Sequence, residues 1–408
     1  MQLSLAHKTK EIQGKLTITG SKSETNRLLL LQALYPDLAI ENKSNSDDSV
    51  AMEHALVSKE NIKDIHHAGT AMRFLTAYFA TKNGDNIVLT GSQRMQERPI
   101  ALLVDALRKL GAQINYSKQE GYPPLEIIGK HLAGGKVGLP ANISSQYISA
   151  LLLIAPRLKQ GLELELEGEI TSLPYIKMTL ALLKRVGITS SFEGKIIRIP
   201  HQEHILNQKQ TVESDWSSAS YWFSAVALCD QGQIELSNYR EDSLQGDAVL
   251  REIYAQLGVE SKFVGPKLLL RKKENFTLPK SLELDLVEAP DIAQTIAVTC
   301  YGLGVACHLK GLHTLKIKET DRLVALENEL SKLGAKITID NESLRLAGEQ
   351  DFQANQAIDT YNDHRMAMAF APLALKLPII INDAGVVSKS YPDFWNDIEN
   401  TGYQVIKN

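Results

Sequence analysis

The hydrophobic pattern of the chain is a repeated unit, in which a short polar or glycine-containing segment leads directly into a strongly apolar run. Six such segments are expected to begin helices: Ser21-Lys22-Ser23, Gly69-Thr70, Ser144-Ser145-Gln146, Ser217-Ser218, Pro290-Asp291 and Asn362-Asp363. From residue 69 onward these helix heads lie 75, 73, 73 and 72 residues apart, whereas the first interval is only 48 residues. The pattern therefore predicts six units, of which the first is shortened by about 25 residues.

A second helix is expected between successive heads, because an apolar residue followed by glycine marks a helix end before a predicted strand. These ends are Leu110-Gly111, Val186-Gly187, Leu257-Gly258, Leu333-Gly334 and Thr401-Gly402. The short first unit lacks such a glycine and has residues 52–60 in its place. Two helices and short strands per unit predict an α/β protein, with three units closed into each of two domains rather than six stacked in a solenoid.

The first helix of each unit is apolar nearly all round, as in residues 28–34, 150–155 and 366–373. Such a helix is expected to be buried, so that only its N-terminal end reaches solvent. A helix N-terminus presents free N–H groups and the positive end of the helix dipole, and both favour anions. The pattern alone therefore indicates a protein that binds anions at several helix heads.

Composition narrows the class of protein. At 408 residues the chain exceeds one ordinary core, which favours two domains of roughly 200 residues each. A net charge of −4 argues against a nucleic-acid or membrane-surface partner. The N-terminus alternates apolar and polar residues without the apolar core of a signal peptide, and the most apolar stretch, residues 148–156, is about half as long as a membrane span. Cys229, Cys300 and Cys307 are odd in number and lack metal-binding spacing, which predicts buried thiols in a reducing cytoplasm.

Cationic residues gather at the element starts of the repeat: Lys22, Arg27, Arg73, Arg98, Lys318, Arg322, Arg365 and Lys389. Taken singly, each motif also has a structural interpretation, such as a capped helix start at Gly20–Arg27 or a surface ion-pair cluster in which Arg94, Glu97 and Arg98 open a helix. Their joint placement at the heads of buried helices favours binding of phosphate and carboxylate groups. Among them stand Asp291 and Glu319, and a carboxylate among cations is suited to act as a base or proton relay.

At these positions the sequence resembles the EPSP synthase family of enolpyruvyl transferases. The matching motifs occur in the family's order: GSKSETNR (20–27), SDD (46–48), AGTAMR (68–73), RMQERPI (94–100), SSQYISALLL (144–153), SLPYI (172–176), PDIAQT (290–295), KIKETDR (316–322), YNDHRMAM (361–368) and SKSYPDF (388–394). The resemblance implies two domains, each of three βαβαββ units in an inside-out α/β barrel, with the chain crossing between them near Gly20 and Ser214. The expected domains are 21–213, and 1–20 with 214–408, with the active-site cleft between them.

The resemblance also implies a reaction. The enolpyruvyl group of phosphoenolpyruvate is added to the 5-hydroxyl of shikimate 3-phosphate, and phosphate is then eliminated, as a step of the shikimate pathway to aromatic amino acids. Asp291 is implied as the base on the 5-hydroxyl and Glu319 as the proton carrier at C3. Lys22 and Lys389 are implied to share proton transfer or to stabilise the phosphate that leaves. No metal or cofactor is expected, and the enzyme is expected to be a monomer.

Site residues follow from the resemblance position by position. Those implied for shikimate 3-phosphate are Lys22, Ser23, Arg27, Ser144, Ser145, Gln146, Ser172, Tyr175, Asp291, Thr314 and Lys318. Those implied for phosphoenolpyruvate are Lys22, Gly69, Arg98, Gln146, Arg322, Arg365 and Lys389. Those expected to line the same cleft are Asp47, His67, Thr70, Arg73 and His364. Gly69 is the residue of the glyphosate-sensitive type, so inhibition by glyphosate is expected.

The sequence departs from the family pattern in places. His66 and His67 stand where Gly-Asn is usual, and His67 is expected to supply a hydrogen bond in place of the asparagine. Phe74 replaces a usual proline after Arg73 and is expected to affect the tilt of the helix that carries Gly69. Thr314 replaces a frequent asparagine near the shikimate phosphate.

Two other functions fit parts of this pattern. A UDP-N-acetylglucosamine enolpyruvyl transferase would begin with Gly-Lys-Asn-Ala and carry a loop cysteine acid, but Ser21-Lys22-Ser23-Glu24 stands here and the cysteine has no counterpart. A non-catalytic sugar-phosphate-binding protein on the same scaffold would keep the arginines and lose the acids. Because Asp291, Glu319 and Lys389 are present, the enzyme is favoured.

Overall fold

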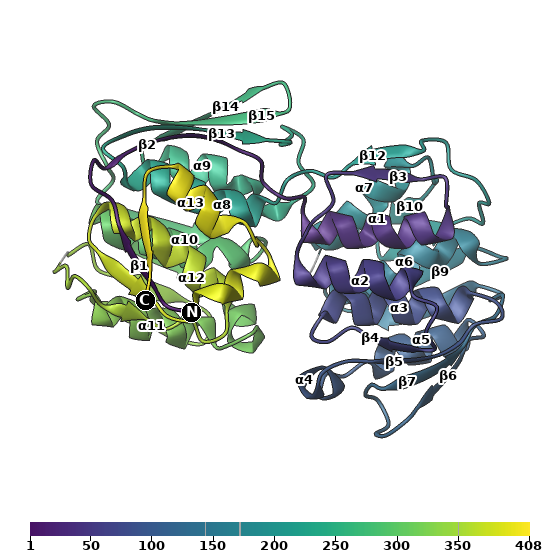
Figure 1. The fold of residues 1–408 in the computed structure, drawn as a ribbon. Helices are drawn as coiled ribbons and strands as arrows, with labels where there is room; N and C mark the ends of the chain where they lie inside the picture. The colour runs from purple at the N-terminus through teal and green to yellow at the C-terminus, as the bar shows by residue number, and fades with distance from the viewer. Residues whose placement is uncertain (143, 171–172, 350) are drawn as a thin grey trace. The chain divides into compact units, whose positions relative to one another are not determined.

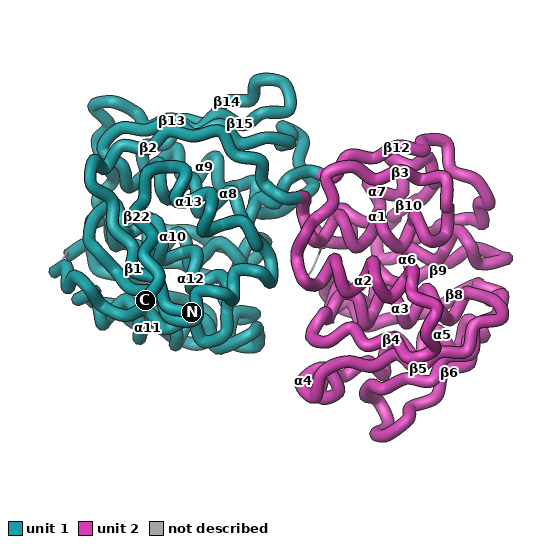
Figure 2. Tube along the Cα trace, in the orientation of Figure 1, with its two compact units in different colours: residues 1–19, 213–408 teal, residues 20–212 magenta. Residues whose placement is uncertain are grey.

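The structure is a computed structural model that describes residues 1–142, 144–170, 173–349 and 351–408 (Figure 1). The chain forms two compact units: unit 1 comprises residues 1–19 and 213–408, and unit 2 comprises residues 20–212 (Figure 2). The chain passes from one unit to the other after residue 19 and again after residue 212, one residue before each boundary expected from the sequence.

The sheets of both units share one plan. In each four-stranded sheet the first strand runs parallel to the second, and the third and fourth strands follow antiparallel. Unit 1 has three such sheets, and their strands lie in the following order. The first is β2 (Glu11–Leu16), β13 (Gln231–Ser237), β15 (Lys267–Lys272) and β14 (Val259–Val264), and the second is β16 (Ser281–Asp285), β17 (Ala306–Lys310), β19 (Leu344–Leu346) and β18 (Ile337–Ile339). The third is β20 (Ala357–Ile358), β21 (Ile379–Ile381), β1 (Leu3–Ala6) and β22 (Gln404–Lys407). Unit 2 has two such sheets. The first is β4 (Ile62–Asp64), β5 (Asn86–Thr90), β7 (Leu125–Ile128) and β6 (Gln113–Tyr116), and the second is β8 (Gly135–Pro140), β9 (Leu162–Glu167), β11 (Ile196–Ile199) and β10 (Ser191–Glu193).

The shortened first unit has a structural counterpart in unit 2. Its sheet consists of the parallel pair β12 (Lys209–Thr211) and β3 (Ala39–Glu41), which lie side by side in register. The antiparallel pair that completes the other five sheets is absent among the described residues of this sheet. The shortening read from the helix-head spacing therefore falls on one hairpin and leaves the helices in place.

Three central helices fill each unit, and sheets surround them. They are α8 (Trp216–Leu228), α10 (Ala293–Leu303) and α12 (His364–Phe370) in unit 1, and α1 (Lys22–Leu34), α3 (Gly69–Thr81) and α6 (Ser145–Ile154) in unit 2. All 13 residues of α8 are buried, as an all-round apolar helix requires. Two of its hydroxyls contact α10: the Thr299 hydroxyl donates to Ser224 Oγ at 2.7 Å, and Ser220 Oγ lies 3.0 Å from Thr295 Oγ1. The α/β architecture of three units in each of two domains is thus confirmed, with the helices inside and the sheets outside.

Each unit also contains further helices. They are α2 (Asp47–Val57), α4 (Gln93–Gln96), α5 (Ala101–Lys109) and α7 (Leu173–Arg185) in unit 2, and α9 (Leu250–Ala255), α11 (Arg322–Lys332) and α13 (Phe394–Asn400) in unit 1. Short 3₁₀ helices are η1 (Ala155–Arg157), η2 (Gly246–Val249), η3 (Pro290–Ile292), η4 (His313–Ile317), η5 (Ala371–Leu375) and η6 (Ala384–Lys389). The predicted glycine stops are confirmed: Gly111 and Gly402, for example, both follow a helix with φ at 101°.

The predicted helix heads are confirmed with local shifts. Helix α8 begins at Trp216, one residue before the expected Ser217, because the Asp215 side chain accepts from the Ser218 N–H and acts as its cap. At Pro290-Asp291 the chain first makes the η3 turn, and α10 follows from Ala293. The expectation that Arg98 opens a helix was wrong, since α4 ends at Gln96.

The first 19 residues complete two sheets of unit 1. Strand β2 lies parallel to β13, and β1 lies antiparallel to both β21 and the C-terminal strand β22. Strand β9 shows why such strands pack one face inward, because its sequence LELELE alternates buried leucines with glutamates. The free cysteines Cys229, Cys300 and Cys307 are buried. Among the described residues, no helix has the length and apolar character needed to cross a membrane.

Candidate functional site

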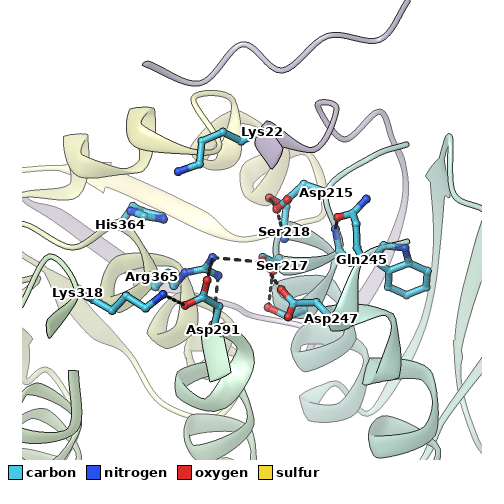
Figure 3. A network of polar contacts seen from close by, with 12 residues as sticks. Lys22, Asp215, Ser217, Ser218, Gln245, Asp247, Asp291, Lys318, His364 and Arg365 are labelled. Carbon is cyan, nitrogen blue, oxygen red and sulfur yellow. Dashed lines mark hydrogen bonds and ion pairs between the residues drawn. The ribbon is translucent and has the colours of Figure 1, made fainter. Parts of the chain in front are cut away.

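The helix heads of unit 1 carry a network of acids and arginines, which we call the carboxylate–arginine network: Asp291, Glu319, Arg322, Asp363 and Arg365. These residues come from η3, the start of α11 and the start of α12, so long-range packing of three helix heads brings them together. Figure 3 shows part of this network, with Arg365 and Lys318 pointing toward Asp291.

Asp291 lies among three cations. Its Oδ1 is 2.8 Å from Arg322 Nη1 and 3.3 Å from Lys318 Nζ, and its Oδ2 is 3.2 Å from Arg365 Nη2. Burial acts to raise the pKa of Asp291, but the charges of Arg365, Lys318 and Arg322 outweigh burial and hold that pKa well below its usual range. The carboxyl is therefore ionised over the physiological pH range.

Arg322 is the buried centre of the network. The residue is 1% exposed, and its guanidinium donates to Asp363 Oδ2 at 2.6 Å, to Asp291 Oδ1 at 2.8 Å and to Glu319 Oε2 at 2.8 Å. Burial acts to lower the pKa of Arg322, but the three carboxylates raise it above the ordinary value. A buried arginine with three carboxylate partners is held in one orientation.

Arg365 joins this network to the head of α8. Its guanidinium donates to the Asp291 backbone oxygen at 3.2 Å and to Ser217 Oγ at 3.2 Å, while the Ser217 hydroxyl donates to Asp247 (Figure 3). Burial, followed by the negative charge of Asp291, raises the pKa of Asp247 to about 6. Two neighbouring carboxyls thus have pKa values displaced in opposite directions, which is an arrangement typical of functional sites.

The head of α12 and the loop after β21 place the other predicted residues of unit 1. Lys389, at the end of η6, donates from Nζ to the backbone oxygen of Asn362 at 2.7 Å and to its Oδ1 at 2.8 Å. His364 is buried at the first position of α12, next to the cap residue Asp363. Glu319 and Lys318 are more exposed, with side chains 36% and 33% accessible.

Thr314 lies in η4, and its hydroxyl oxygen is buried without a hydrogen-bond partner among the described residues.

Unit 2 carries the second group of predicted residues, beginning at the head of α1. Lys22 Nζ lies 3.6 Å from Asp48 Oδ2, while Asp47 begins α2 one residue earlier and is half-buried. Arg27 is 3% exposed and donates to Ser23 O at 2.7 Å, to Thr179 Oγ1 at 2.8 Å and to Ser149 Oγ at 3.1 Å. Burial lowers the pKa of Arg27 to about 10.

The head of α3 lies against an arginine. A Cβ added at Gly69 would come within 2.5 Å of Arg98 Nη1, so the guanidinium of Arg98 packs directly over this glycine. Arg73, by contrast, is 4% exposed and donates to backbone oxygens, to Gly69 at 3.2 Å and to Pro99 at 3.1 Å. Arg73 therefore ties the α3 head to the segment that carries Arg98.

The head of α6 is joined to that of α3 by a side-chain contact. Ser144 caps α6 by accepting from the Gln146 N–H, and Gln146 Nε2 donates to Thr70 Oγ1 at 3.1 Å. Ser145 is buried. Tyr175, on α7, is 40% exposed, and its ring lies 6.0 Å from the Arg27 guanidinium. The expected residue Ser172 lies outside the described residues.

The residues that depart from the family pattern, His66, His67 and Phe74, differ in how far they are buried. His66 has φ at 48° and its N–H donates to Asp64 Oδ1 at 2.8 Å, whereas His67 is exposed. Phe74 is fully buried within α3, which continues unbroken to Thr81, and the Arg27 guanidinium lies 5.5 Å from its ring.

Sequence reasoning missed two acids of these clusters, Asp48 and Asp247. Asp48 is the second acid of the SDD motif, and its contact with Lys22 was not foreseen because only Asp47 was singled out. Asp247 follows Gly246 in η2, and its partner Ser217 is 30 residues away, so no local signal connects them. Across the described residues, no group of three or more His, Cys, Asp or Glu side chains is arranged to hold a metal ion.

Comparison with known proteins gives consistent results. A model of the family EPSP synthase (3-phosphoshikimate 1-carboxyvinyltransferase) matches residues 37–398. A 3-phosphoshikimate 1-carboxyvinyltransferase from Bacteroides fragilis is 47% identical over 401 residues, covering 97% of each chain. The enzyme of that name from Haemophilus influenzae is 36% identical, covering 95% of this chain and 96% of its own.

Solved structures agree at the level of the fold. EPSP synthase from Acinetobacter baumannii superposes with a TM-score of 0.82 at 22% identity, with 100% of both chains covered. The enolpyruvyl transferase NikO from Streptomyces tendae superposes with a TM-score of 0.72 at 15% identity, over 99% of this chain and 98% of its own.

Proposed function

The chain belongs to the EPSP synthase family, and on that premise we propose that it transfers the enolpyruvyl group of phosphoenolpyruvate to the 5-hydroxyl of shikimate 3-phosphate. The observation that carries the proposal is that two acids, Asp291 and Glu319, share the buried guanidinium of Arg322. A binding protein has no need of such acids, because they repel the anionic substrates that the neighbouring cations attract.

Substrate binding is assigned to both units. For shikimate 3-phosphate we propose Lys22, Ser23, Arg27, Ser144, Ser145, Gln146, Ser172, Tyr175, Asp291, Thr314 and Lys318. For phosphoenolpyruvate we propose Lys22, Gly69, Arg98, Gln146, Arg322, Arg365 and Lys389. The support is chemical: phosphate and carboxylate groups are matched by guanidinium forks, ammonium groups and helix N-termini.

The reaction has two steps. In the first, the substrate 5-hydroxyl attacks C2 of phosphoenolpyruvate while C3 gains a proton, which gives a tetrahedral ketal phosphate. In the second, the C2–O bond to phosphate breaks and C3 loses a proton, so the double bond forms again and phosphate leaves. Glu319 is the proposed proton carrier at C3, since its carboxylate is exposed enough to reach a ligand and is oriented by Arg322.

Asp291 is the proposed base on the 5-hydroxyl, and its surroundings set a condition on that role. Its depressed pKa makes it a weak base while Lys318, Arg322 and Arg365 surround it. Substrate phosphate and carboxylate groups compete for Lys318 and Arg365, and this competition raises the proton affinity of Asp291. Binding of the anionic substrates thus activates the base.

The experiment that tests the function is phosphate release by the purified protein with phosphoenolpyruvate, with and without shikimate 3-phosphate. We expect release that requires both substrates and an enolpyruvyl ether as product. Binding of both ligands without release would contradict the proposal and favour a sugar-phosphate-binding protein. Release with UDP-N-acetylglucosamine in place of shikimate 3-phosphate would favour the other transferase.

The proposal includes three further properties. The enzyme acts as a monomer, which sedimentation at several concentrations tests. It acts in the cytoplasm, for which the buried, unpaired thiols of Cys229, Cys300 and Cys307 are the support. It is inhibited by glyphosate, since Gly69 leaves room for the Arg98 guanidinium, and unchanged turnover with glyphosate present would contradict this point.

A further inference from the structure

Two consecutive residues before helix α12 adopt left-handed backbone conformations. Tyr361 has φ at 53° and Asn362 has φ at 57°. A side chain with a Cβ crowds the backbone at positive φ, so such residues keep this conformation only where their surroundings impose it. Here the surroundings act on both residues: the Tyr361 hydroxyl donates to Glu329 Oε1 at 2.6 Å, and Lys389 Nζ donates to both oxygens of Asn362.

Glu329 is a buried carboxylate whose two oxygens serve different partners. The residue is 0% exposed and lies on α11, two turns after Arg322. Its Oε1 accepts from the Tyr361 hydroxyl, whereas its Oε2 accepts from Lys332 Nζ at 2.8 Å and from the Asp359 N–H at 3.1 Å. A buried carboxylate is costly unless it is paired in this way. The Lys332 ammonium compensates its charge, the Asp359 N–H donates a hydrogen bond, and the bond to Tyr361 is additional.

We propose that Glu329 and Tyr361 are positioning residues for the groups that bind phosphoenolpyruvate, an inference that rests on the function proposed above. Their bond holds Tyr361 in the left-handed conformation, and this conformation sets the direction of the Asn362 carbonyl. That carbonyl and the Asn362 Oδ1 hold the ammonium of Lys389.

The same turn also fixes the positions of two arginines, Arg322 and Arg365, through Asp363. Asp363 follows Asn362 directly, and its Oδ1 accepts from the Arg365 N–H at 2.8 Å and so caps α12. Its Oδ2 accepts from Arg322 Nε at 2.6 Å. If the left-handed pair relaxed, Asp363 would lose its position at the helix head. One bond between a hydroxyl and a carboxylate therefore orders Lys389, Arg322 and Arg365 together.

The test is Tyr361→Phe, which removes the hydroxyl and keeps the ring. Because one hydrogen bond to a charged acceptor is lost, we expect the KM for phosphoenolpyruvate to rise about tenfold. The KM for shikimate 3-phosphate is expected to stay unchanged.

Lys332→Met is the matched control, since it removes an ammonium from the same carboxylate without touching Tyr361. We expect it to lower the melting temperature and to leave both KM values unchanged. An unchanged KM for phosphoenolpyruvate in Tyr361→Phe, or an equal rise in the Lys332→Met control, would overturn the inference. The dissociation constant for phosphoenolpyruvate, measured by calorimetry with shikimate 3-phosphate present, gives the same comparison without turnover. Failure of the wild type to release phosphate would count against the proposed function, whereas wild-type turnover with unaltered Tyr361→Phe kinetics would count against this inference alone.

Discussion

Asp247→Asn is expected to stabilise the protein at neutral and alkaline pH. Burial and the charge of Asp291 raise the pKa of Asp247 from 3.8 to about 6 in the folded state. A carboxyl with a raised pKa in the folded state favours folding in its protonated form. This contribution is fully present below pH 3.8 and is lost as the pH rises through about 6. Above that pH the ionised carboxylate destabilises the folded state, and an asparagine, which carries no charge, removes this destabilisation.

The expected gain in the free energy of unfolding follows from the pKa shift of Asp247. A difference of about two pKa units corresponds to at most about 3 kcal/mol in the free energy of unfolding. Because Asp247 is only half-buried and accepts from Ser217, we expect about 1–3 kcal/mol. For a unit of about 200 residues this raises the melting temperature by about 2–12 °C.

The assay is differential scanning calorimetry of the wild type and Asp247→Asn between about pH 4.5 and about pH 8.5. The variant should melt higher than the wild type at the alkaline end, and the difference should shrink toward the acid end. Asp242→Asn, at an exposed position five residues earlier, is the control for loss of a surface carboxylate. A difference that is the same at every pH, or a variant that melts lower at alkaline pH, would refute the reasoning.

Three further outcomes are expected. Glu319→Gln should lower kcat by about 10²–10⁴ in the phosphate-release assay with little change in either dissociation constant, and an unchanged kcat would remove Glu319 from proton transfer. Gly69→Ala should raise the KM for phosphoenolpyruvate about tenfold or more, because the new Cβ would come within 2.5 Å of Arg98 Nη1. An unaltered KM would show that Arg98 does not bind this substrate. Asp363→Ala should lower the free energy of unfolding by about 3–5 kcal/mol, because it removes a buried partner of Arg322 and the cap of α12. Calorimetry measures this loss, and an unchanged melting temperature would contradict it.

The sequence predicted the parts of the fold that depend on local signals. The helix heads, the glycine stops such as Gly111 and Gly402, and the shortening of the first unit all appear in the structure. They were predictable because caps, left-handed glycines and all-round apolar helices are properties of short segments. The pairing of β1 with β22 was not predictable in this way, since it joins residues about 400 positions apart.

The candidate site shows the same limit. Resemblance identified Asp291, Glu319 and Arg322, and the structure brings them into contact. The resemblance did not reveal that Arg73 donates to the backbone oxygens of Gly69 and Pro99. Every residue has a backbone carbonyl, so the residue types do not show which carbonyl accepts a hydrogen bond. Contacts across 30 or more positions, such as that between Ser217 and Asp247, likewise depend on how the helix heads pack.

The discontinuity of unit 1 has a consequence for the order in which the molecule folds. Residues 20–212 leave the ribosome as a complete unit, but strands β1 and β2, made before them, await partners made later. Strand β2 pairs with β13, and β1 pairs with β21 and with residues 404–407, which are made about 400 residues later. Unit 2 can therefore assemble during translation, while the sheet of unit 1 that contains β1 closes only after residues 404–407 have been made.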